Sequence, residues 1–317
     1  MNQEYVVIDV GGTSIKYALM DSHAATLDSG MIPTPYAGLK PYLSVLCNIF
    51  ETYDNSRNIA GIALSVPGII DSEKGYLYTG GSLNFISNFP LSSVLSEKCG
   101  VPVTVENDGK CAALAEAWRG SLKDCQDAIV ILLGTGVGGG IIKNGKVHKG
   151  KHFSAGEFSF IQMGDQYESM ENLWGMQSGN KKLCQMVAAA KNKKAAELDG
   201  LKIFELANGG DPVVLKVLGR FTMTIARMIF NLQTIYDPEK IAIGGGISRQ
   251  NLLIEMIQSN LDYLYQVFPC KIPKAQIVQC HYFNEANRIG ALRTFQLHEI
   301  CNGGHERGKY DVEPQIF

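Results

Sequence analysis

The sequence of 317 residues contains little charge and almost no excess of either sign. Only 19% of the residues are Asp, Glu, Lys or Arg, and 29 basic against 31 acidic side chains leave a formal charge of -2. Proteins that bind nucleic acid or membrane headgroups through charge need a basic patch or segment. We therefore expect neither nucleic acid nor a membrane among its partners.

Long apolar runs and paired cysteines are also missing. No apolar run approaches the ~20 residues that cross a bilayer. The first run, Tyr5–Val10, contains Asp9 and has no basic leader, so it does not resemble a signal peptide. The eight cysteines are scattered and form no CxxC pair. We expect a cytoplasmic protein whose thiols are reduced and structural.

Apolar residues and glycine, by contrast, are abundant: 45% of the chain is hydrophobic and 34 residues are glycine. This composition excludes disorder over most of the length and predicts a large core with many tight turns. The length favours two domains of roughly 150 residues each. Apolar strands alternate with helical patterns, which is typical of the α/β class.

The pattern predicts the following elements. The expected strands are Tyr5–Val10, Ser14–Met20, Ile59–Val66, Val101–Val105, Ala128–Leu133, Ile141–Ile142 and Ile241–Gly246. The expected helices are Leu39–Tyr53, Lys110–Trp118, Lys181–Lys191, Pro212–Ile235 and Asn251–Asp262. The polar, glycine-bearing end, Cys301–Phe317, is expected to fray.

Three glycine-rich segments follow apolar strands. Asp9–Thr13 and Leu133–Gly140 each join two strands, and their likeness indicates an internal duplication, while Ile243–Ser248 precedes a helix. Successive glycine N–H groups can approach a phosphate closely, and threonine hydroxyls add donors. A Gly-Gly segment alone is more often only a turn, but three together favour an anion site. Asp9 beside that anion is unfavourable unless Mg²⁺ lies between them.

Two other phosphate-binding motifs do not fit this sequence. Gly134, Gly136 and Gly139 satisfy the spacing GxGxxG, but the dinucleotide fingerprint requires a helix directly after the loop. Here Ile141–Gly145 reads as strand and turn. The Walker A pattern, G-x-x-x-x-G-K-[ST], does not occur in the sequence.

Several polar residues each have two interpretations. Asp108, between a strand and a helix, is either an N-cap or a carboxylate that takes a proton from an alcohol attacking phosphate. Glu157 is either a solvated loop residue or an acceptor for sugar hydroxyls. Asn84 has the same two interpretations, because an amide both donates to and accepts from a diol.

The order of the motifs resembles the ROK family (repressors, open reading frames, kinases), which belongs to the actin/hexokinase superfamily. The segments that carry the resemblance are Asp9–Lys16, Ser65–Gly68, Glu106–Ala113, Leu133–Ile142 and Ile243–Ser248. The similarity extends from about residue 5 to about residue 297.

The resemblance implies two RNase H-like α/β domains around an interdomain cleft. They would be 1–118, completed by a helix near 286–300, and 119–285, with 301–317 as a polar tail. It also implies an ATP-dependent kinase in which Asp108 is the base that activates a hexose 6-hydroxyl, with Mg²⁺ as a cofactor. Asn84, Asn107 and Glu157 match sugar-contacting positions. The ATP-binding positions are Asp9, Gly11, Gly12, Thr13, Lys16, Gly134, Thr135, Gly136, Gly244, Gly245 and Gly246.

The sequence departs from the family after Glu157. Many members continue as Glu-x-Gly-His before a cysteine cluster that binds structural zinc, whereas this chain continues as Glu157-Phe-Ser-Phe160 without cysteine from 126 to 183. We therefore expect no zinc site. Glu171 is the nearest candidate for the second sugar-contacting glutamate, although an alignment on Ser178-Gly179 places Trp174 there. Zinc-less members include β-glucoside, glucose and N-acetylmannosamine kinases.

A repressor and a sugar-binding protein without catalysis are the alternative functions. Family repressors carry a helix-turn-helix domain before the first phosphate motif, whereas eight residues precede Asp9 and no basic recognition helix is present. We therefore expect no repressor, and the presence of Asp108 favours catalysis over sugar binding alone. The sugar stays open, because one or two hydrogen bonds decide between hexoses. A homodimer is expected, and the apolar helix Val213–Ile235 is a candidate for the dimer face.

Overall fold

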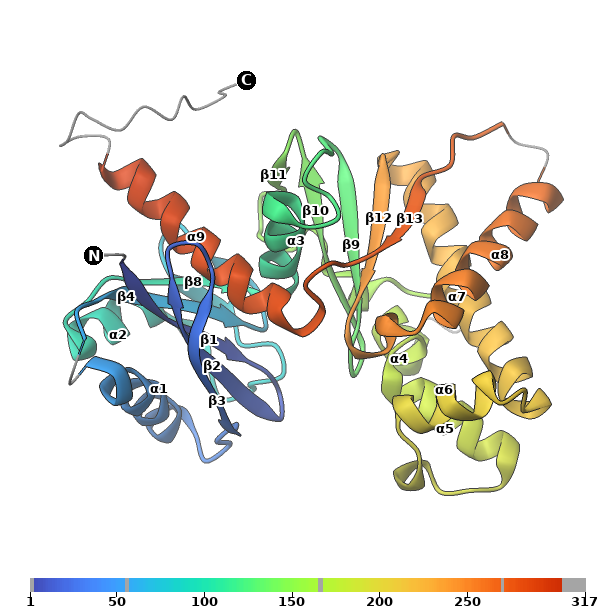
Figure 1. The fold of residues 1–317 in the computed structure, drawn as a ribbon, viewed down its shortest axis with the longest axis horizontal. Helices are drawn as coiled ribbons and strands as arrows, with labels where there is room; N and C mark the ends of the chain where they lie inside the picture. Colours follow the sequence, from blue (N-terminus) through green and yellow to red (C-terminus); the bar gives the residue numbers. More distant parts are fainter. Residues whose placement is uncertain (1–2, 55–56, 165–167, 269–270, 304–317) are drawn as a thin grey trace. The chain divides into compact units, whose positions relative to one another are not determined.

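The computed structural model describes residues 3–54, 57–164, 168–268 and 271–303. The contacts divide the chain into two compact units (Figure 1): the first holds residues up to Glu106 and from Ala291 onward, and the second runs from Asn107 to Gly290. The chain returns to the first unit through α9 (Ala286–Gly303). The boundary predicted after residue 118 lies one helix further along the chain than this division.

A five-stranded sheet of order β3-β2-β1-β4-β8 forms the centre of the first unit. Its strands are β1 (Glu4–Val10), β2 (Ser14–Asp21), β3 (Thr26–Pro33), β4 (Ile59–Val66) and β8 (Val103–Asn107). β1 is antiparallel to β2 and parallel to β4. A small second sheet contains β5 (Ile70–Asp71), β6 (Tyr76–Thr79) and β7 (Ser87–Phe89).

Successive side chains of β1 point to opposite faces of the sheet, and helices pack against both faces. Val6 and Ile8 belong to a core shared with α1 (Leu39–Asp54) and α2 (Leu91–Cys99). Tyr5 contacts Phe295 of α9, with 5.3 Å between the ring centroids. Gly61 of β4 leaves room for this ring, because a Cβ there would lie 2.2 Å from Phe295.

The second unit repeats the strand order of the first as β11-β10-β9-β12-β13. Its strands are β9 (Ala128–Leu133), β10 (Val137–Lys143), β11 (Lys146–Val147), β12 (Lys240–Gly244) and β13 (Gln276–Gln279). As in the first sheet, the leading strand, β9, is antiparallel to its hairpin partner, β10, and parallel to β12. The matching order supports the internal duplication inferred from the two hairpins.

Helices cover both faces of the second sheet. α3 (Asp108–Arg119) lies on the face where Ala113 packs with Val130 and Ile142. Ile129 and Ile131 point to the opposite face, into a larger core. The helices on that side are α4 (Trp174–Gln177), α5 (Asn180–Lys191), α6 (Gly200–Asn208), α7 (Pro212–Tyr236) and α8 (Asn251–Val267).

Glycines allow the backbone of α3 to approach its neighbours very closely. A Cβ on Gly109 would lie 2.2 Å from the carbonyl oxygen of Gly139, and one on Gly140 would lie 2.7 Å from Ala113 Cβ. At the other end of the unit, a Cβ on Gly290 would lie 1.8 Å from the carbonyl oxygen of Cys111. The first turn of α3 is therefore packed against β10 on one side and the start of α9 on the other.

The α/β fold class is confirmed, and every helix and strand expected from the sequence is present. Several bounds differ: the strand expected at Val101–Val105 is β8, two residues later, β10 begins at Val137 rather than after Gly140, and β12 ends at Gly244 rather than at Gly246. Glycines of a supposed loop are thus part of a strand. The expected frayed end begins inside α9 at Cys301, and residues 304–317 lie outside the described residues.

Further properties concern the thiols, the helices and α7. The cysteines that the structure describes are free thiols. None of the described helices combines the length and the hydropathy needed to cross a membrane. Most apolar side chains of α7 pack in the core of the second unit, whereas Val213 and Ile235 are 39% and 79% exposed.

Candidate active site

Asn107 and Asp108 stand where β8 ends and α3 begins. Asn107 is the N-cap of α3, since its side chain accepts a hydrogen bond from the Lys110 N–H at 3.0 Å. Asp108 is the first helical residue, and its Oδ1 accepts from the Gly109 N–H at 2.8 Å. The interpretation of Asp108 as the N-cap is therefore wrong. A carboxylate at this end of a helix is favoured by the helix dipole.

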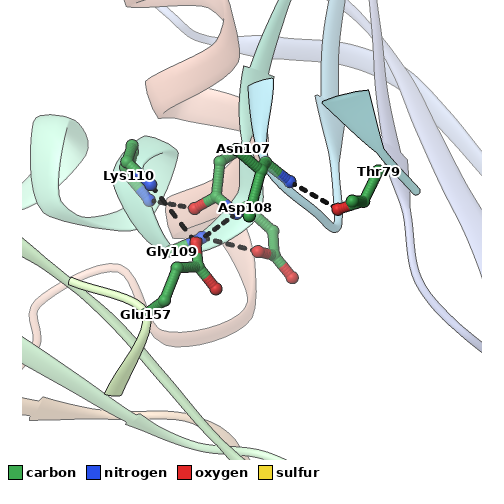
Figure 2. A network of polar contacts seen from close by, with 7 residues as sticks. Thr79, Asn107, Asp108, Gly109, Lys110 and Glu157 are labelled. Carbon is green, nitrogen blue, oxygen red and sulfur yellow. Dashed lines mark hydrogen bonds and ion pairs between the residues drawn. The ribbon is translucent and has the colours of Figure 1, made fainter. Parts of the chain in front are cut away.

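Glu157 joins this group from the loop before the short 3₁₀ helix η1 (Phe158–Phe160). Figure 2 shows its carboxylate turned toward α3, where Oε1 accepts from Asn107 Nδ2 at 3.2 Å and from Lys110 Nζ at 3.3 Å. Its side chain is 20% exposed. Burial raises the pKa of Glu157, and the Lys110 ammonium lowers it again in part. The structure therefore excludes a fully solvated Glu157.

Gly156 holds the Glu157 loop close to β10. Its φ is +87°, a conformation that favours glycine, and a Cβ there would lie 3.0 Å from the Cα of Gly140. Gly140 and its neighbour Gly139 also contact α3 at Gly109. Glycines of three segments therefore meet at one point and bring Asp108, on the helix, and Glu157, on the loop, together.

Lys110 is a site residue that the sequence analysis missed. Its side chain is fully buried, although lysine is almost never fully buried without a partner. One signal was available: Lys110 stands alone among the small apolar residues Cys111, Ala112 and Ala113 in the first turns of the expected helix. A single charge on a buried helix face indicates a buried ion pair.

A cavity of about 460 Å³ lies elsewhere in the second unit. It is lined at the β9–β10 turn by Gly134 and Thr135, after β12 by Gly246 and Arg249, and at the start of α5 by Asn180. Apart from the glycine and its two chain neighbours, no described atom lies within 4 Å of the place where a Cβ on Gly134 or Gly246 would stand. Backbone groups that face open space in such a cavity fit the phosphates of a nucleotide.

The remaining predicted glycines of this unit have packing roles. A Cβ on Gly136 would lie 2.8 Å from the Gly175 carbonyl oxygen, and one on Gly245 would lie 2.3 Å from the Leu133 carbonyl oxygen. Gly244 is buried at the end of β12. Gly245 thus joins the turn after β12 to the end of β9, and Gly136 packs against α4, while Gly134, Thr135 and Gly246 line the cavity.

In the first unit, Asp9 and the β1–β2 turn form a second polar group. Asp9 is 7% exposed, and its Oδ1 accepts from Ser65 Oγ at 2.8 Å. The carbonyl oxygens of Gly11 and Gly12 accept from the hydroxyls of Thr34 and Tyr36. Thr13 is exposed, and Lys16 is the cross-strand partner of Asp9.

The donor set at Asp9 is compatible with Mg²⁺. This ion is usually held by one or two carboxylates and completes its octahedron with phosphate oxygens and water. Within the described residues, no group of three or more His, Cys, Asp or Glu side chains is placed to hold a metal ion. A lone carboxylate therefore fits Mg²⁺ that is shared with a nucleotide rather than a protein-only metal site.

The last two sugar candidates, Asn84 and Glu171, are both exposed. Asn84 lies in a turn two residues after Ser82, whose Oγ would be 3.2 Å from a Cβ on Gly12, so this turn lies against the β1–β2 turn. Glu171 lies in the 3₁₀ helix η2 (Met170–Asn172), and its hydrogen bonds with Ser169 and Gln177 use backbone atoms. Trp174, the alternative, is fully buried against Phe158.

Comparison with known proteins gives consistent results. The model of the ROK family matches residues 5–297. A β-glucoside kinase from Klebsiella pneumoniae is 28% identical over 300 residues, which cover 90% of this chain and 94% of that protein. An N-acetyl-D-glucosamine kinase from Haemophilus influenzae is 29% identical and covers 85% of this chain and 89% of its own length.

Among solved structures, a ROK family protein from Streptococcus pneumoniae, crystallised in complex with sucrose, has a TM-score of 0.82 and 28% sequence identity. The match covers 94% of this chain and 100% of the other. The similarity of fold therefore extends over both units.

Proposed function

Because this chain belongs to the ROK family, we propose that it is a sugar kinase that transfers a phosphoryl group from ATP to the 6-hydroxyl of a hexose, with Asp108 as the base. The observation that carries the proposal is the gathering of Asn107, Asp108 and Glu157 at the start of α3. A carboxylate that can accept a proton stands there beside an amide and a second carboxylate that can hold a diol.

The residues of the second unit would act as follows. ATP would supply the γ-phosphoryl group, and the Mg²⁺ bound to it would neutralise part of the phosphate charge. Asp108 orients the sugar hydroxyl and accepts its proton while the hydroxyl oxygen bonds to phosphorus and the bond to the leaving ADP breaks. Glu157 and Asn107 hold other hydroxyls of the sugar, so that the reacting oxygen is placed within reach of Asp108.

The nucleotide would be bound by backbone N–H groups and hydroxyls of the glycine-rich turns. In the second unit, Gly134, Thr135 and Gly246 would contact it, because they line the 460 Å³ cavity. Gly136, Gly244 and Gly245 would shape these turns. In the first unit, Gly11, Gly12 and Thr13 would contact the phosphates, Lys16 would assist, and Asp9 would hold Mg²⁺.

The sugar is proposed to be a hexose or a disaccharide that contains one. The name of the β-glucoside kinase relative and the sucrose in the pneumococcal structure support a site that accepts two rings. Asn84 and Glu171 are exposed and would contact a second ring or an outer hydroxyl. The protein is further proposed to act in the cytoplasm as a homodimer. Size-exclusion chromatography with light scattering would measure its oligomeric state.

A coupled assay of ADP release tests the proposal with glucose, N-acetylmannosamine, N-acetylglucosamine, fructose and cellobiose. At least one sugar should be phosphorylated, and Asp108→Asn should lower kcat about a hundredfold to ten-thousandfold, as expected for the loss of a general base. Sugar affinity, measured by calorimetry, should change little. The exposed Asp124 supplies a matched control, since Asp124→Asn should behave like the wild type.

Two results would contradict the proposal. If Asp108→Asn kept near-normal turnover, Asp108 would not be the base. If the wild-type protein bound a sugar tightly without releasing ADP, the alternative function, a sugar-sensing or sugar-binding ROK protein without catalysis, would replace the kinase.

A further inference from the structure

Lys110, beside Asn107, Asp108 and Glu157, has a fully buried side chain, and the proposed function leaves it without a role. Its Nζ lies 3.3 Å from Glu157 Oε1. Taking an ammonium out of water is costly, and a buried ion pair is often no more stable than apolar residues of similar volume. The other buried charge of this helix, Glu116, accepts hydrogen bonds from backbone N–H groups of Ser121, His281 and Tyr282, whereas the remaining buried positions hold glycine, cysteine and alanine. A lysine buried at this place therefore needs an explanation other than stability.

The geometry shows what Lys110 does to Glu157. Both donors, Lys110 Nζ and Asn107 Nδ2, bond to the same oxygen, Oε1. The carboxylate is thereby held in one orientation, and among the described residues no hydrogen bond is made to its other oxygen, Oε2, which can accept a hydroxyl of a ligand. Because Lys110 has no exposed surface, it acts on a ligand only through Glu157.

We propose that Lys110 is a positioning residue for sugar binding: it holds the Glu157 carboxylate in one orientation and favours its charged form, so that the site binds its sugar down to a lower pH than it would without Lys110. This rests on the proposed sugar site. A protonated Glu157 would offer a weaker acceptor and a competing donor. Loss of Lys110 should therefore weaken sugar binding most at low pH.

The charged groups around Glu157 support this assignment. On α3 they are Lys110 and Asp108, and Asp108 bonds through Oδ1 to the Gly109 N–H. β10 contributes the glycines Gly139 and Gly140 at this point. The loop before Glu157 carries Lys149 together with Lys151 and His152, which are both exposed. Burial raises the pKa of Glu157, and Lys110 is the charged group that opposes this effect.

The experiment compares the wild type with Lys110→Met between pH 5.5 and 8.5 and measures kcat and the sugar KM separately. Without Lys110 the pKa of Glu157 should rise further, so the pH below which KM increases should move upward. KM at the acid end would then be about tenfold above that of the wild type, while kcat changes less. Lys123→Met, at an exposed lysine just beyond α3, is the matched control.

Two further variants separate positioning from folding. The Glu157→Gln side chain cannot ionise, so the KM of this variant should be high and independent of pH. The double variant with Lys110→Met should also show a KM that does not depend on pH. Lys110→Arg keeps the charge and should keep the wild-type pH profile. Melting temperatures and circular dichroism identify any variant that does not fold, in which case Lys110→Arg and Glu157→Gln carry the test.

A KM profile of Lys110→Met that superimposes on that of the wild type would overturn the proposal and leave Lys110 a purely structural ion pair. Failure of the kinase function is a separate result. If the wild type binds a sugar without phosphorylating it, the same variants are compared by calorimetric Kd against pH, and the expected upward shift in pH is unchanged.

Discussion

Asn107 serves two purposes with one side chain. Its Oδ1 caps α3 through the Lys110 N–H, and its Nδ2 donates to Glu157. The same residue therefore fixes where the helix starts and where the acidic loop is held. Asn107→Asp would keep the cap but would put a third carboxylate beside Asp108 and Glu157, which explains why an amide suits this position better than an acid.

Asp211, the N-cap of α7, makes the stability of the folded protein depend on pH. Its Oδ1 accepts from the Val213 and Val214 N–H groups at the start of α7, and Oδ2 pairs with Lys191. The hydrogen bond from Lys191 is the main reason that the pKa of Asp211 is lowered. A lowered pKa gives stability that is present above the usual range of Asp and is lost as the pH falls through the lowered value.

We therefore expect Asp211→Asn to melt at a lower temperature than the wild type at pH 7, with a difference that shrinks as the pH falls below the usual range of Asp. A series of thermal melts against pH measures this, with Asp124→Asn as the exposed control. A difference that stays constant with pH would contradict the role of the charge.

The sequence predicted most residues of the site but not their contacts. Asp108, Asn107 and Glu157 could be identified from the motifs that resemble the ROK family, and the structure brings these three together. Asn and Asp are equally good N-caps, so composition alone could not decide which residue starts α3. Lys110 was missed because lysine is normally exposed, and its ion pair joins residues 47 positions apart.

At the scale of elements, the packing of α3 on β10 depends on glycine. The run Gly138–Gly140 was interpreted as part of a loop because glycine is uncommon in strands, yet these residues belong to β10. Their small size allows the helix backbone to approach the strand, which is one of the reasons that glycine occurs inside strands. Sequence patterns record the glycines, whereas the close approach depends on a partner far along the chain.

Gly109→Ala should therefore destabilise the protein by about 1–3 kcal/mol, as overpacking does, because its Cβ would lie 2.2 Å from a backbone oxygen that cannot rotate away. Turnover should fall as well, since Asp108 is the adjacent residue. Chemical denaturation and the ADP assay measure the two effects.

Gly219→Ala in α7 is the control for this substitution. Its Cβ would meet only Met256 Cε, at 3.9 Å, and alanine favours a helix, so this variant should be at least as stable as the wild type. Unchanged stability of Gly109→Ala would show that α3 can move away from β10 at little cost.

At the scale of the whole molecule, the central strands of both sheets were predicted and several edge elements were missed. β1, β4, β9 and β12 are apolar runs bounded by turn residues, which is a strong signal. β3 is mostly exposed along its length, and the strands of the small sheet have two to four residues each. Such strands form because a neighbouring strand offers hydrogen bonds, and the sequence does not show that neighbour.

Removal of metal ions tests two expectations, that the fold needs no zinc and that activity needs Mg²⁺. Since Glu157 is followed by phenylalanine rather than by metal ligands, a zinc-selective chelator such as phenanthroline should leave the melting temperature unchanged. Removal of Mg²⁺ with EDTA should abolish ADP release, and added Mg²⁺ should restore it. Unfolding on zinc chelation, or full activity without a divalent cation, would contradict these expectations.

The contact between Gly290 and the first turn of α3 bears on whether the segment Asn107–Gly290 can be circularly permuted or inserted into another protein. It places the last residue of the segment Asn107–Gly290 beside residues near its beginning. Segments whose ends meet are those that tolerate circular permutation and insertion into a host protein. A circularly permuted version of this segment with new termini at the exposed turn Asn192–Lys194 would change the order of the strands along the chain. Their order within the second sheet would stay the same.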